Sequence, residues 1–401
     1  MSAPDPSPAP AAPARGARKA NAALALATVL VSLFAIELAL RFVKRGVPFQ
    51  PDPDLFRSLR PNIVAPIYSY ETKNALEEGG RDAPTRPVLA GNNNTNNIGF
   101  RMDTDVGEKL PDERRILLLG DSFTEADQVA GDKRFSSLVD AQLREETKDA
   151  PKHERLLNGG IQNGSPAQYA LQLRKWLPEL HPDVVIVALA PNDVADDLIW
   201  ERTYGLTFDA EGGPLAPIAR GRLTAIQSSY LLRYFFVYLQ QGGQERLEKV
   251  FAPIVPELPA LDNGDLMCRG DARAKGYFNE KTAKYLRWMK QRSEAAGAKF
   301  AVLLIQYMWF FDDEPYSEMF APPYKEVMKD CYASHGHVYN EFAEAFLREA
   351  GIPFQNPYEA LLSAKKENPT RKLWHFVDYH YSPAGHRVIA GELHKLVASL
   401  R

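Results

Sequence analysis

The sequence is poor in cysteine, in excess charge of one sign and in clustered metal ligands. Of its 401 residues only two are cysteine, Cys268 and Cys331, and neither has another Cys or a His at zinc-site spacing. The two can form a disulfide if the domain lies outside the cytoplasm, and are expected to be reduced if it lies inside. Lys plus Arg number 48 against 51 Asp plus Glu, without a basic stripe. We therefore expect no metal site and no nucleic-acid partner.

Long apolar runs are also scarce, with one exception near the N-terminus. Residues 1–19 are rich in Pro and Ala and lack aromatics, which predicts a disordered tail. From Ala20 to Leu40 the only charge is Glu37, and a helix of this length can span a bilayer. We interpret 20–43 as a single transmembrane anchor; a cleaved signal peptide and a soluble core helix are the alternatives. Basic residues flank the run on both sides, so charge alone leaves its orientation open.

The rest of the chain divides into a Pro-, Asn- and Gly-rich stretch and a regular domain. Residues 44–112 are expected to form an extended membrane-proximal segment, and residues 113–401 a domain in which strands and helices alternate, as in a parallel α/β sheet. At 195–275 the alternation breaks, which indicates an insertion with a loop or hairpin at 203–215 and an aromatic-rich helix at 228–241. This insertion could be a lid, a packed core element or a membrane contact. The expected strands lie at 116–119, 155–158, 184–190, 299–305 and 352–356, and the expected helices at 134–147, 167–180, 281–297, 339–350 and 382–400.

Ser122 lies in LLLGDSFTE, directly after an apolar run typical of a strand buried on both faces. Gly-Asp-Ser is also common turn chemistry, so the tripeptide alone is weak. The carboxyl edge of a parallel sheet, however, is where ligands bind, and a serine on a tight strand-to-helix turn exposes its hydroxyl there. Ser122 is therefore a candidate nucleophile.

A serine nucleophile needs a base, an acid that orients the base, and donors for the oxyanion. In FVDYHYSPAGH, Asp378 and His380 stand two residues apart, so in an extended segment their side chains share a face. Asn192 follows the strand VVIVALA and leaves the same sheet edge as Ser122. The loop NGGIQNGS can turn a backbone N–H toward a substrate. Each feature alone also has a structural reading, as a surface pair, a helix cap or a turn.

Together these stretches resemble the SGNH, or GDSL-type, hydrolases. GDSF at 120–123, NGGIQNG at 158–164, PND at 191–193 and DYHYSPAGH at 378–386 follow the family's order, and NNIGFR at 96–101 resembles its membrane-anchored bacterial members. The resemblance implies a three-layer α/β/α, flavodoxin-like fold with a mainly parallel sheet, and no cofactor. By resemblance, the catalytic residues are Ser122, Asp378 and His380, the oxyanion donors are Ser122, Asn163 and Asn192, and the supporting residues are Asp121, Gly160, Gly164 and Asp193.

The sequence departs from the family at three positions. The acid stands two residues before the histidine where the family usually has three, Asn163 occupies a usual glycine, and Ala190 replaces the glycine before the PND block.

We expect a serine esterase that removes or transfers an acyl group, with O-acetyl as the first choice, on a cell-surface or secreted polysaccharide. Its domain is expected in the periplasm or outside the cell. The alternatives are a carbohydrate O-acetyltransferase, a non-catalytic glycan-binding component of polysaccharide export, and a lipid esterase.

Overall fold

The computed structural model describes most of the hydrolase-like domain and one N-terminal helix. It describes residues 15–43, 49–69 without 53 and 65, 88–197 without 93 and 195, 206–216, 229, 231, 275–311 without 277, 329–375 without 335, and 379–401. By its internal contacts the chain divides into two units. One comprises residues 1–47 and 221–247, and the other comprises residues 48–220 and 248–401.

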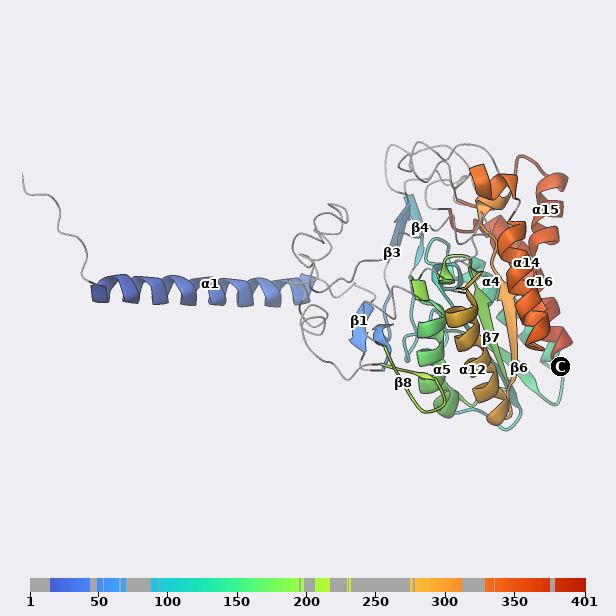
Figure 1. Ribbon diagram of the computed structural model, residues 1–401, viewed down its shortest axis with the longest axis horizontal. Helices are drawn as coiled ribbons and strands as arrows, with labels where there is room; N and C mark the ends of the chain where they lie inside the picture. Colours follow the sequence, from blue (N-terminus) through green and yellow to red (C-terminus); the bar gives the residue numbers. More distant parts are fainter. Residues whose placement is uncertain are drawn as a thin grey trace, which may run out of the picture. The chain divides into compact units, whose positions relative to one another are not determined.

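A five-stranded sheet with every strand parallel to its neighbours forms the centre of the larger unit (Figure 1). Its order is β11-β10-β7-β5-β6, which is 2-1-3-4-5 when these five strands are numbered along the chain. That order is the flavodoxin-like one, with the topological switch point between β5 and β7. The strands are β5 (Glu113–Gly120), β6 (His153–Asn158), β7 (Val184–Leu189), β10 (Lys299–Leu304) and β11 (Phe354–Gln355).

The helices cover both faces of this sheet, as the expected three-layer fold requires. The crossovers between the strands are right-handed, so the direction in which the chain steps along the sheet decides which face the connecting helix covers. The step from β5 to β6 goes toward one edge and places α4 on one face. The later steps, to β7, β10 and β11, go toward the other edge and place α5, α12 and α14 on the opposite face. The C-terminal α16 packs on α4, and α5 packs on α12. Their bounds are α4 (Phe135–Thr147), α5 (Pro166–Leu180), α12 (Ala283–Ala295), α14 (His337–Glu349), α15 (Tyr358–Glu367) and α16 (Pro383–Ser399).

The core forms where the apolar runs of the strands meet the apolar faces of these helices. All six residues of β7 are fully buried, which explains why the sequence of this strand is a continuous apolar run without polar alternation. In α16, Ser382 accepts hydrogen bonds from the backbone N–H groups of Ala384 and Gly385, so it is the expected N-cap. The apolar run of β7 and the N-cap residue of α16 were therefore predicted correctly from the sequence.

Short elements surround the sheet. Two antiparallel pairs lie within the expected extended segment, and a third pairs residues 207–208 with 214–215, a hairpin inside the range 203–215 where a loop or hairpin was expected. The helix α15 had no counterpart among the expected elements. The aromatic-rich helix expected at 228–241 lies outside the described residues, apart from Ser229 and Leu231. The remaining elements are β1 (Phe49–Asp52), β2 (Phe56–Leu59), β3 (Pro66–Ser69), β4 (Val88–Asn92), α3 (Ser122–Glu125), η2 (Gly131–Lys133), β8 (Thr207–Phe208), β9 (Pro214–Leu215), η3 (Phe278–Thr282) and η4 (Met308–Phe310).

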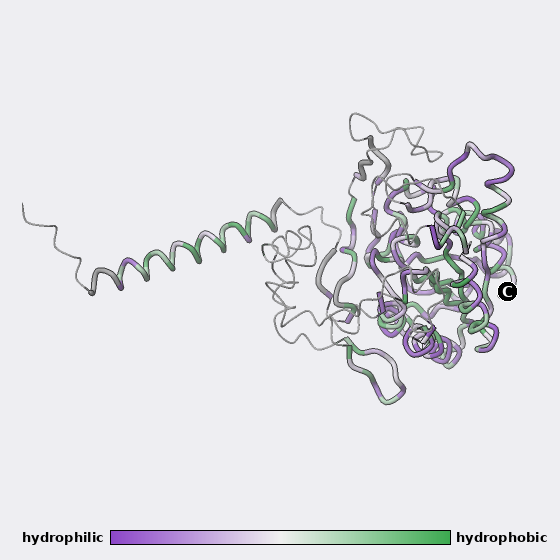
Figure 2. The backbone as a smooth tube through the Cα atoms, turned by 45° about the horizontal axis from the view of Figure 1, so that its top comes forward, coloured by the Kyte–Doolittle hydropathy of each residue, from purple (hydrophilic) through white to green (hydrophobic). Residues whose placement is uncertain are grey.

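The N-terminal apolar run forms the helix α1 (Arg15–Val43), which begins five residues before the expected start at Ala20. The stretch Lys19–Leu40 has a mean hydropathy of 2.4 and none of it is buried, so it can cross a membrane by length and composition. Figure 2 shows this helix as largely hydrophobic beyond its first turns. Near its end the Glu37 carboxylate accepts hydrogen bonds from the Ser229 hydroxyl, at 2.8 Å, and the Leu231 N–H, at 2.9 Å. A signal sequence and a single anchor both fit this helix.

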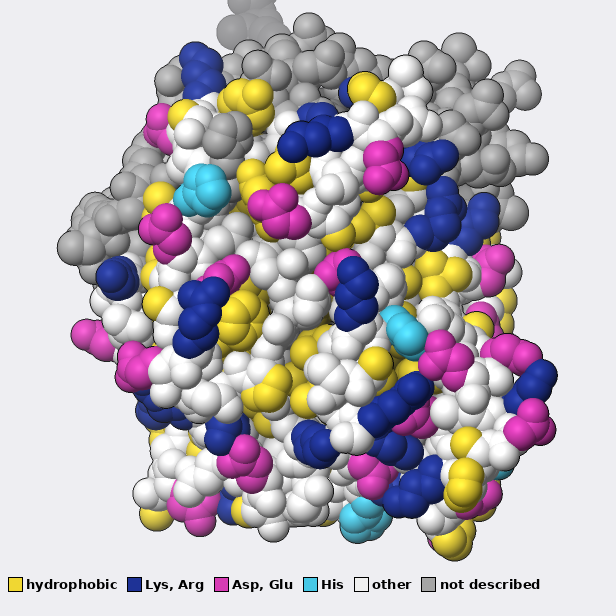
Figure 3. Space-filling model, turned by 90° about the vertical axis from the view of Figure 1, so that its right-hand side faces the viewer, with side chains coloured by type: hydrophobic (Ala, Val, Ile, Leu, Met, Phe, Trp, Pro, Cys, Tyr) yellow, Lys and Arg dark blue, Asp and Glu magenta, His cyan; other side chains and the backbone are white. Residues whose placement is uncertain are grey.

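The surface of the domain carries mixed charge. On the face drawn in Figure 3, Lys and Arg side chains alternate with Asp and Glu, and no field of one sign covers it. That face therefore offers no basic patch of the kind that binds nucleic acid.

Candidate active site

Ser122 lies where the strand β5 turns into the single-turn helix α3. Asp121 caps this helix, since its carboxylate accepts the Phe123 N–H at 3.0 Å. Ala126, with a φ of 52°, ends the turn. The serine therefore stands at the carboxyl end of β5, as its place in the sequence predicts, and β5 borders the switch point of the sheet.

His380 faces this serine from a segment far away in the sequence. Its Nε2 lies 2.8 Å from the Ser122 Oγ, so the imidazole can accept the hydroxyl proton directly. The His380 ring also packs against Phe123, with ring centroids 4.6 Å apart. A contact between residues 258 positions apart is the strongest geometric link between the separate sequence stretches.

The segment that carries His380 is tied to the sheet through Tyr381. The Tyr381 hydroxyl accepts from the Gln306 N–H at 2.9 Å and donates to the Gln306 carbonyl at 2.8 Å, just beyond β10. The His375 N–H donates to the His380 carbonyl at 2.8 Å, which closes a turn. Tyr379 has a φ of 57°, a conformation that costs energy for a residue other than glycine. These contacts hold the imidazole in place over Ser122.

Asp378, the expected partner of His380, lies outside the described residues. With Nε2 directed at Ser122, Nδ1 is the imidazole atom that an orienting carboxylate would contact.

Asn192 follows β7 and lies on the same sheet edge. Its Oδ1 accepts a hydrogen bond from the Tyr307 hydroxyl, and its Nδ2 donates to Asp196 at 2.6 Å. The Asp196 contact fixes which end of the amide is the donor, because an ionised carboxylate only accepts, and the Tyr307 hydroxyl then donates to Oδ1. The Asp196 bond uses one of the two Nδ2 hydrogens, so Asn192 keeps one amide N–H at the edge of the sheet where Ser122 lies.

Two buried carboxylates support this edge from below. Burial raises the pKa of Asp121 to about 6, although the charge of His380 and the hydrogen bond from the Phe123 N–H oppose the shift. Asp193 accepts the Ala190 N–H at 2.8 Å and the Tyr169 hydroxyl at 2.9 Å, so it shapes the turn after β7. Burial and the nearby Asp121 charge raise the pKa of Asp193 well above its usual value. Asp121 and Asp193 therefore both lie buried at the sheet edge that carries Ser122.

The loop after β6 passes beside α3. Asn163 adopts a φ of 51°, the left-handed region in which a glycine is usual, so asparagine takes over that backbone conformation here. Gly160 is pressed against α3: a Cβ at this position would lie 2.4 Å from the Glu125 nitrogen. The Gly164 N–H donates to the Ile161 carbonyl at 3.0 Å and closes the loop. Of the expected loop residues, Gly160 therefore lies against Ser122's helix, whereas the Gly164 hydrogen bond stays within the loop.

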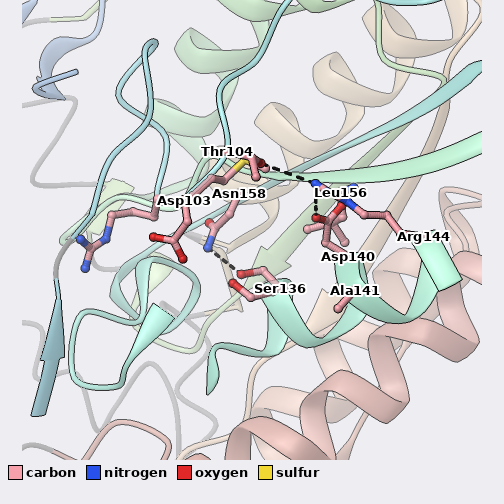
Figure 4. Close-up of a pocket in the computed structure, with 11 residues that line it drawn as sticks. Asp103, Thr104, Ser136, Asp140, Ala141, Arg144, Leu156 and Asn158 are labelled. Carbon is pink, nitrogen blue, oxygen red and sulfur yellow. Dashed lines mark hydrogen bonds and ion pairs between the residues drawn. The ribbon is translucent and has the colours of Figure 1, made fainter. Parts of the chain in front are cut away.

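A cavity of about 200 Å³ lies elsewhere, between the chain after Arg101, α4 and β6. Figure 4 shows the residues that line it, among them Asp103, Thr104, Ser136 and Asp140. Ser122, His380 and Asn192 are not among its lining residues, so this cavity is separate from the candidate active site. Within the described part of the chain, no group of His, Cys, Asp and Glu side chains is arranged to hold a metal ion.

Several residues at the site were not expected from the sequence. Tyr307 and Asp196 hold the Asn192 amide, and Arg101 and Glu125 lie beneath the loop after β6. Tyr307 could have been predicted from its position just after the buried strand β10, because residues that follow such strands lie at the ligand-binding edge of the sheet.

A serine and a histidine in contact at the switch point of a parallel sheet form the arrangement of nucleophile and base that serine hydrolases use. The chain belongs to the GDSL-like Lipase/Acylhydrolase family, also called SGNH hydrolases, whose family model matches residues 118–388. The family consists of carboxylic ester hydrolases, and this chain is one of its acylhydrolases.

Solved structures with a similar fold are distant in sequence. TesA is 15% identical, with 72% of this chain and 100% of TesA covered and a TM-score of 0.35. The acetyl xylan esterase AlAXEase is 14% identical, with 71% and 99% covered and a TM-score of 0.38. The esterase EstA from Pseudoalteromonas sp. is 11% identical, with 71% and 97% covered and a TM-score of 0.34. A sequence comparison with curated proteins finds no match.

Proposed function

We propose that Ser122 is the nucleophile of a serine esterase and that His380 is its general base. The observation that carries this proposal is the 2.8 Å contact between the Ser122 Oγ and the His380 Nε2. As the hydroxyl oxygen bonds to the ester carbonyl carbon, its proton passes to Nε2. His380 then returns that proton to the departing alcohol oxygen, which leaves an acyl-serine. Water attacks the acyl-serine in the second half, and His380 again accepts and returns a proton.

The carbonyl oxygen becomes negatively charged in both halves, and donors must stabilise it. We assign this role to the backbone N–H groups of Ser122 and Asn163 and to the side-chain amide of Asn192. The Asn192 amide is held by Tyr307 and Asp196 before substrate arrives, which lowers the cost of orienting it. We assign to Asp378 the orientation of His380 through Nδ1.

Replacing Asn192 tests the side-chain donor. Asn192→Ala removes an aimed N–H, so we expect kcat for p-nitrophenyl acetate to fall about 10²–10³-fold with a much smaller change in KM. Asn97→Ala is the control, because the Asn97 amide bonds only to the backbone of Val106 among its described side-chain contacts. Equal kcat in Asn192→Ala and the control would exclude Asn192 from the oxyanion hole.

The proposed substrate is an O-acetyl ester on a cell-surface or secreted polysaccharide. Cys331 is disulfide-bonded, which supports an oxidising compartment outside the cytoplasm. An N-terminal anchor would hold the domain beside the envelope, in the periplasm or outside the cell. The half-buried rings of Trp309 and Tyr379, 5.5 Å apart, stand next to His380 and offer flat apolar surfaces to a sugar ring.

Acetate release tests the substrate. The full chain in detergent is incubated with O-acetylated polysaccharide, with the same polymer after alkaline deacetylation, and with p-nitrophenyl esters of acetate and palmitate. We expect Ser122-dependent acetate release from the acetylated polymer and preference for the acetate ester. Turnover of palmitate alone would instead indicate a lipid esterase. Transfer of acetyl to an added oligosaccharide, in place of free acetate, would identify an O-acetyltransferase, which shares the same acyl-serine.

A further inference from the structure

Arg101, the last residue of NNIGFR, has a fully buried side chain beneath the candidate active site. Its Nε lies 3.7 Å from Oε1 of Glu125, whose side chain is only 1% exposed. Burial lowers the pKa of the Arg101 guanidinium, and the Glu125 carboxylate is the largest of the charges that oppose this shift. An ion pair withdrawn from water in this way is costly to bury, so its net contribution to stability is small.

Glu125 is three residues after Ser122, at the end of the single-turn helix α3. Its other oxygen, Oε2, accepts the backbone N–H of Gln162, in the loop that carries Asn163. One carboxylate thus joins the helix of the expected nucleophile to the loop of an expected oxyanion donor. A hydrogen bond to an ionised acceptor is about twice as strong as a neutral one, which suits a position where the loop must not move.

A second set of hydrogen bonds, made by Asn158, connects the same helix and loop. The Asn158 Nδ2 donates to the Thr124 carbonyl and to the Ser136 Oγ, both at 2.8 Å, while its Oδ1 accepts the Gly160 N–H at 2.9 Å (Figure 4 shows the Ser136 bond). Arg101 joins the same strand end, since its N–H donates to the Asn158 carbonyl at 3.2 Å. The Arg101 carbonyl in turn accepts from Arg134 at 3.1 Å.

We propose that Glu125, charge-balanced by Arg101, is a positioning residue that sets the oxyanion loop 159–164 against the helix of Ser122. Gly160 shows how closely the two segments must meet, because even a Cβ there would lie 2.4 Å from the Glu125 nitrogen. The segment 96–101 then contributes to catalysis without touching substrate. This inference rests on the proposed function, because it assigns the loop to the oxyanion hole.

The test is Glu125→Gln in the full chain, which keeps the shape of the side chain and removes its charge. The control is Glu113→Gln, since Glu113 and Arg115 form another buried ion pair, with 2.7 Å between Oε2 and Nη2, at the opposite end of β5. We expect kcat for p-nitrophenyl acetate to fall about tenfold or more in Glu125→Gln with KM within about threefold, and to stay near wild type in the control.

Hydrogen exchange of the amides at 159–164 is the second readout, because it follows the loop without requiring turnover. We expect faster exchange there in Glu125→Gln and unchanged exchange in the control. If Glu125→Gln fails to fold, Glu125→Asp replaces it, because the shorter side chain keeps the charge near Arg101 but withdraws from the Gln162 N–H.

The outcomes separate this inference from the proposed function. Wild-type loop exchange in a folded Glu125 variant overturns the positioning role, as does a kcat no lower than that of the control. A wild-type chain without Ser122-dependent turnover overturns the proposed function, and loop exchange then still decides whether Glu125 holds the loop.

Discussion

Ser122→Ala is expected to reduce ester turnover by about 10³- to 10⁶-fold while leaving the fold intact. The alanine removes only the oxygen that lies 2.8 Å from the His380 Nε2, and Ser122 is half-buried at the start of α3. The residual rate would come from the oxyanion donors, which bind the transition state for attack by water. The measurement is the initial rate with p-nitrophenyl acetate, together with circular dichroism to confirm the fold.

Ser137→Ala is the matched control, because Ser137 is another half-buried serine and lines the separate cavity beside α4. Covalent labelling by a fluorophosphonate gives an independent readout, since the reagent reacts only with an activated serine. Labelling should be lost in Ser122→Ala and kept in Ser137→Ala. Wild-type turnover by Ser122→Ala would assign catalysis to another residue. Absence of turnover and labelling in the wild-type chain would favour the non-catalytic glycan-binding role.

The fold was largely predictable from the sequence because its central strands are buried on both faces. A strand such as β7 then shows as an uninterrupted apolar run, and the residue that follows it lies at the ligand-binding edge of the sheet. Ser122 and Asn192 were found in this way. His380 needed the chemical argument that a serine requires a base, since 258 residues separate it from Ser122.

The residues that hold this edge in place were not predictable, because they depend on pairs of side chains that only the folded chain brings together. Glu125 in the sequence is an ordinary helix residue, and its contact with Arg101 and the Gln162 N–H appears only when the loop after β6 packs on α3. Tyr307 likewise acts through Asn192, 115 residues away. The helix α15 was missed because it is short and has no apolar run, with Leu361 as its buried residue.

His380→Ala is expected to lower kcat as far as Ser122→Ala does, and the double variant should be no worse than either one. The reason is that the nucleophile and its base act as one unit, so removing either leaves the same residual catalysis. The comparison of the three variants with p-nitrophenyl acetate therefore tests whether the 2.8 Å contact is functional. Additive losses in the double variant would show that His380 acts on the substrate independently of Ser122.

Asp378→Asn then tests which acid orients His380. If Asp378 fixes the imidazole through Nδ1, the asparagine stabilises the wrong tautomer and kcat should fall by about 10⁴-fold. Asp121→Asn is the informative comparison, because the Asp121 charge also acts on His380 while the Asp121 carboxylate accepts the Phe123 N–H. A larger loss in Asp121→Asn than in Asp378→Asn would move the orienting role to the acid beside the serine. A larger loss in Asp378→Asn would show that an acid two residues before the histidine can orient a working base. The left-handed conformation of Tyr379 between them means that this stretch is not the extended segment expected from the sequence.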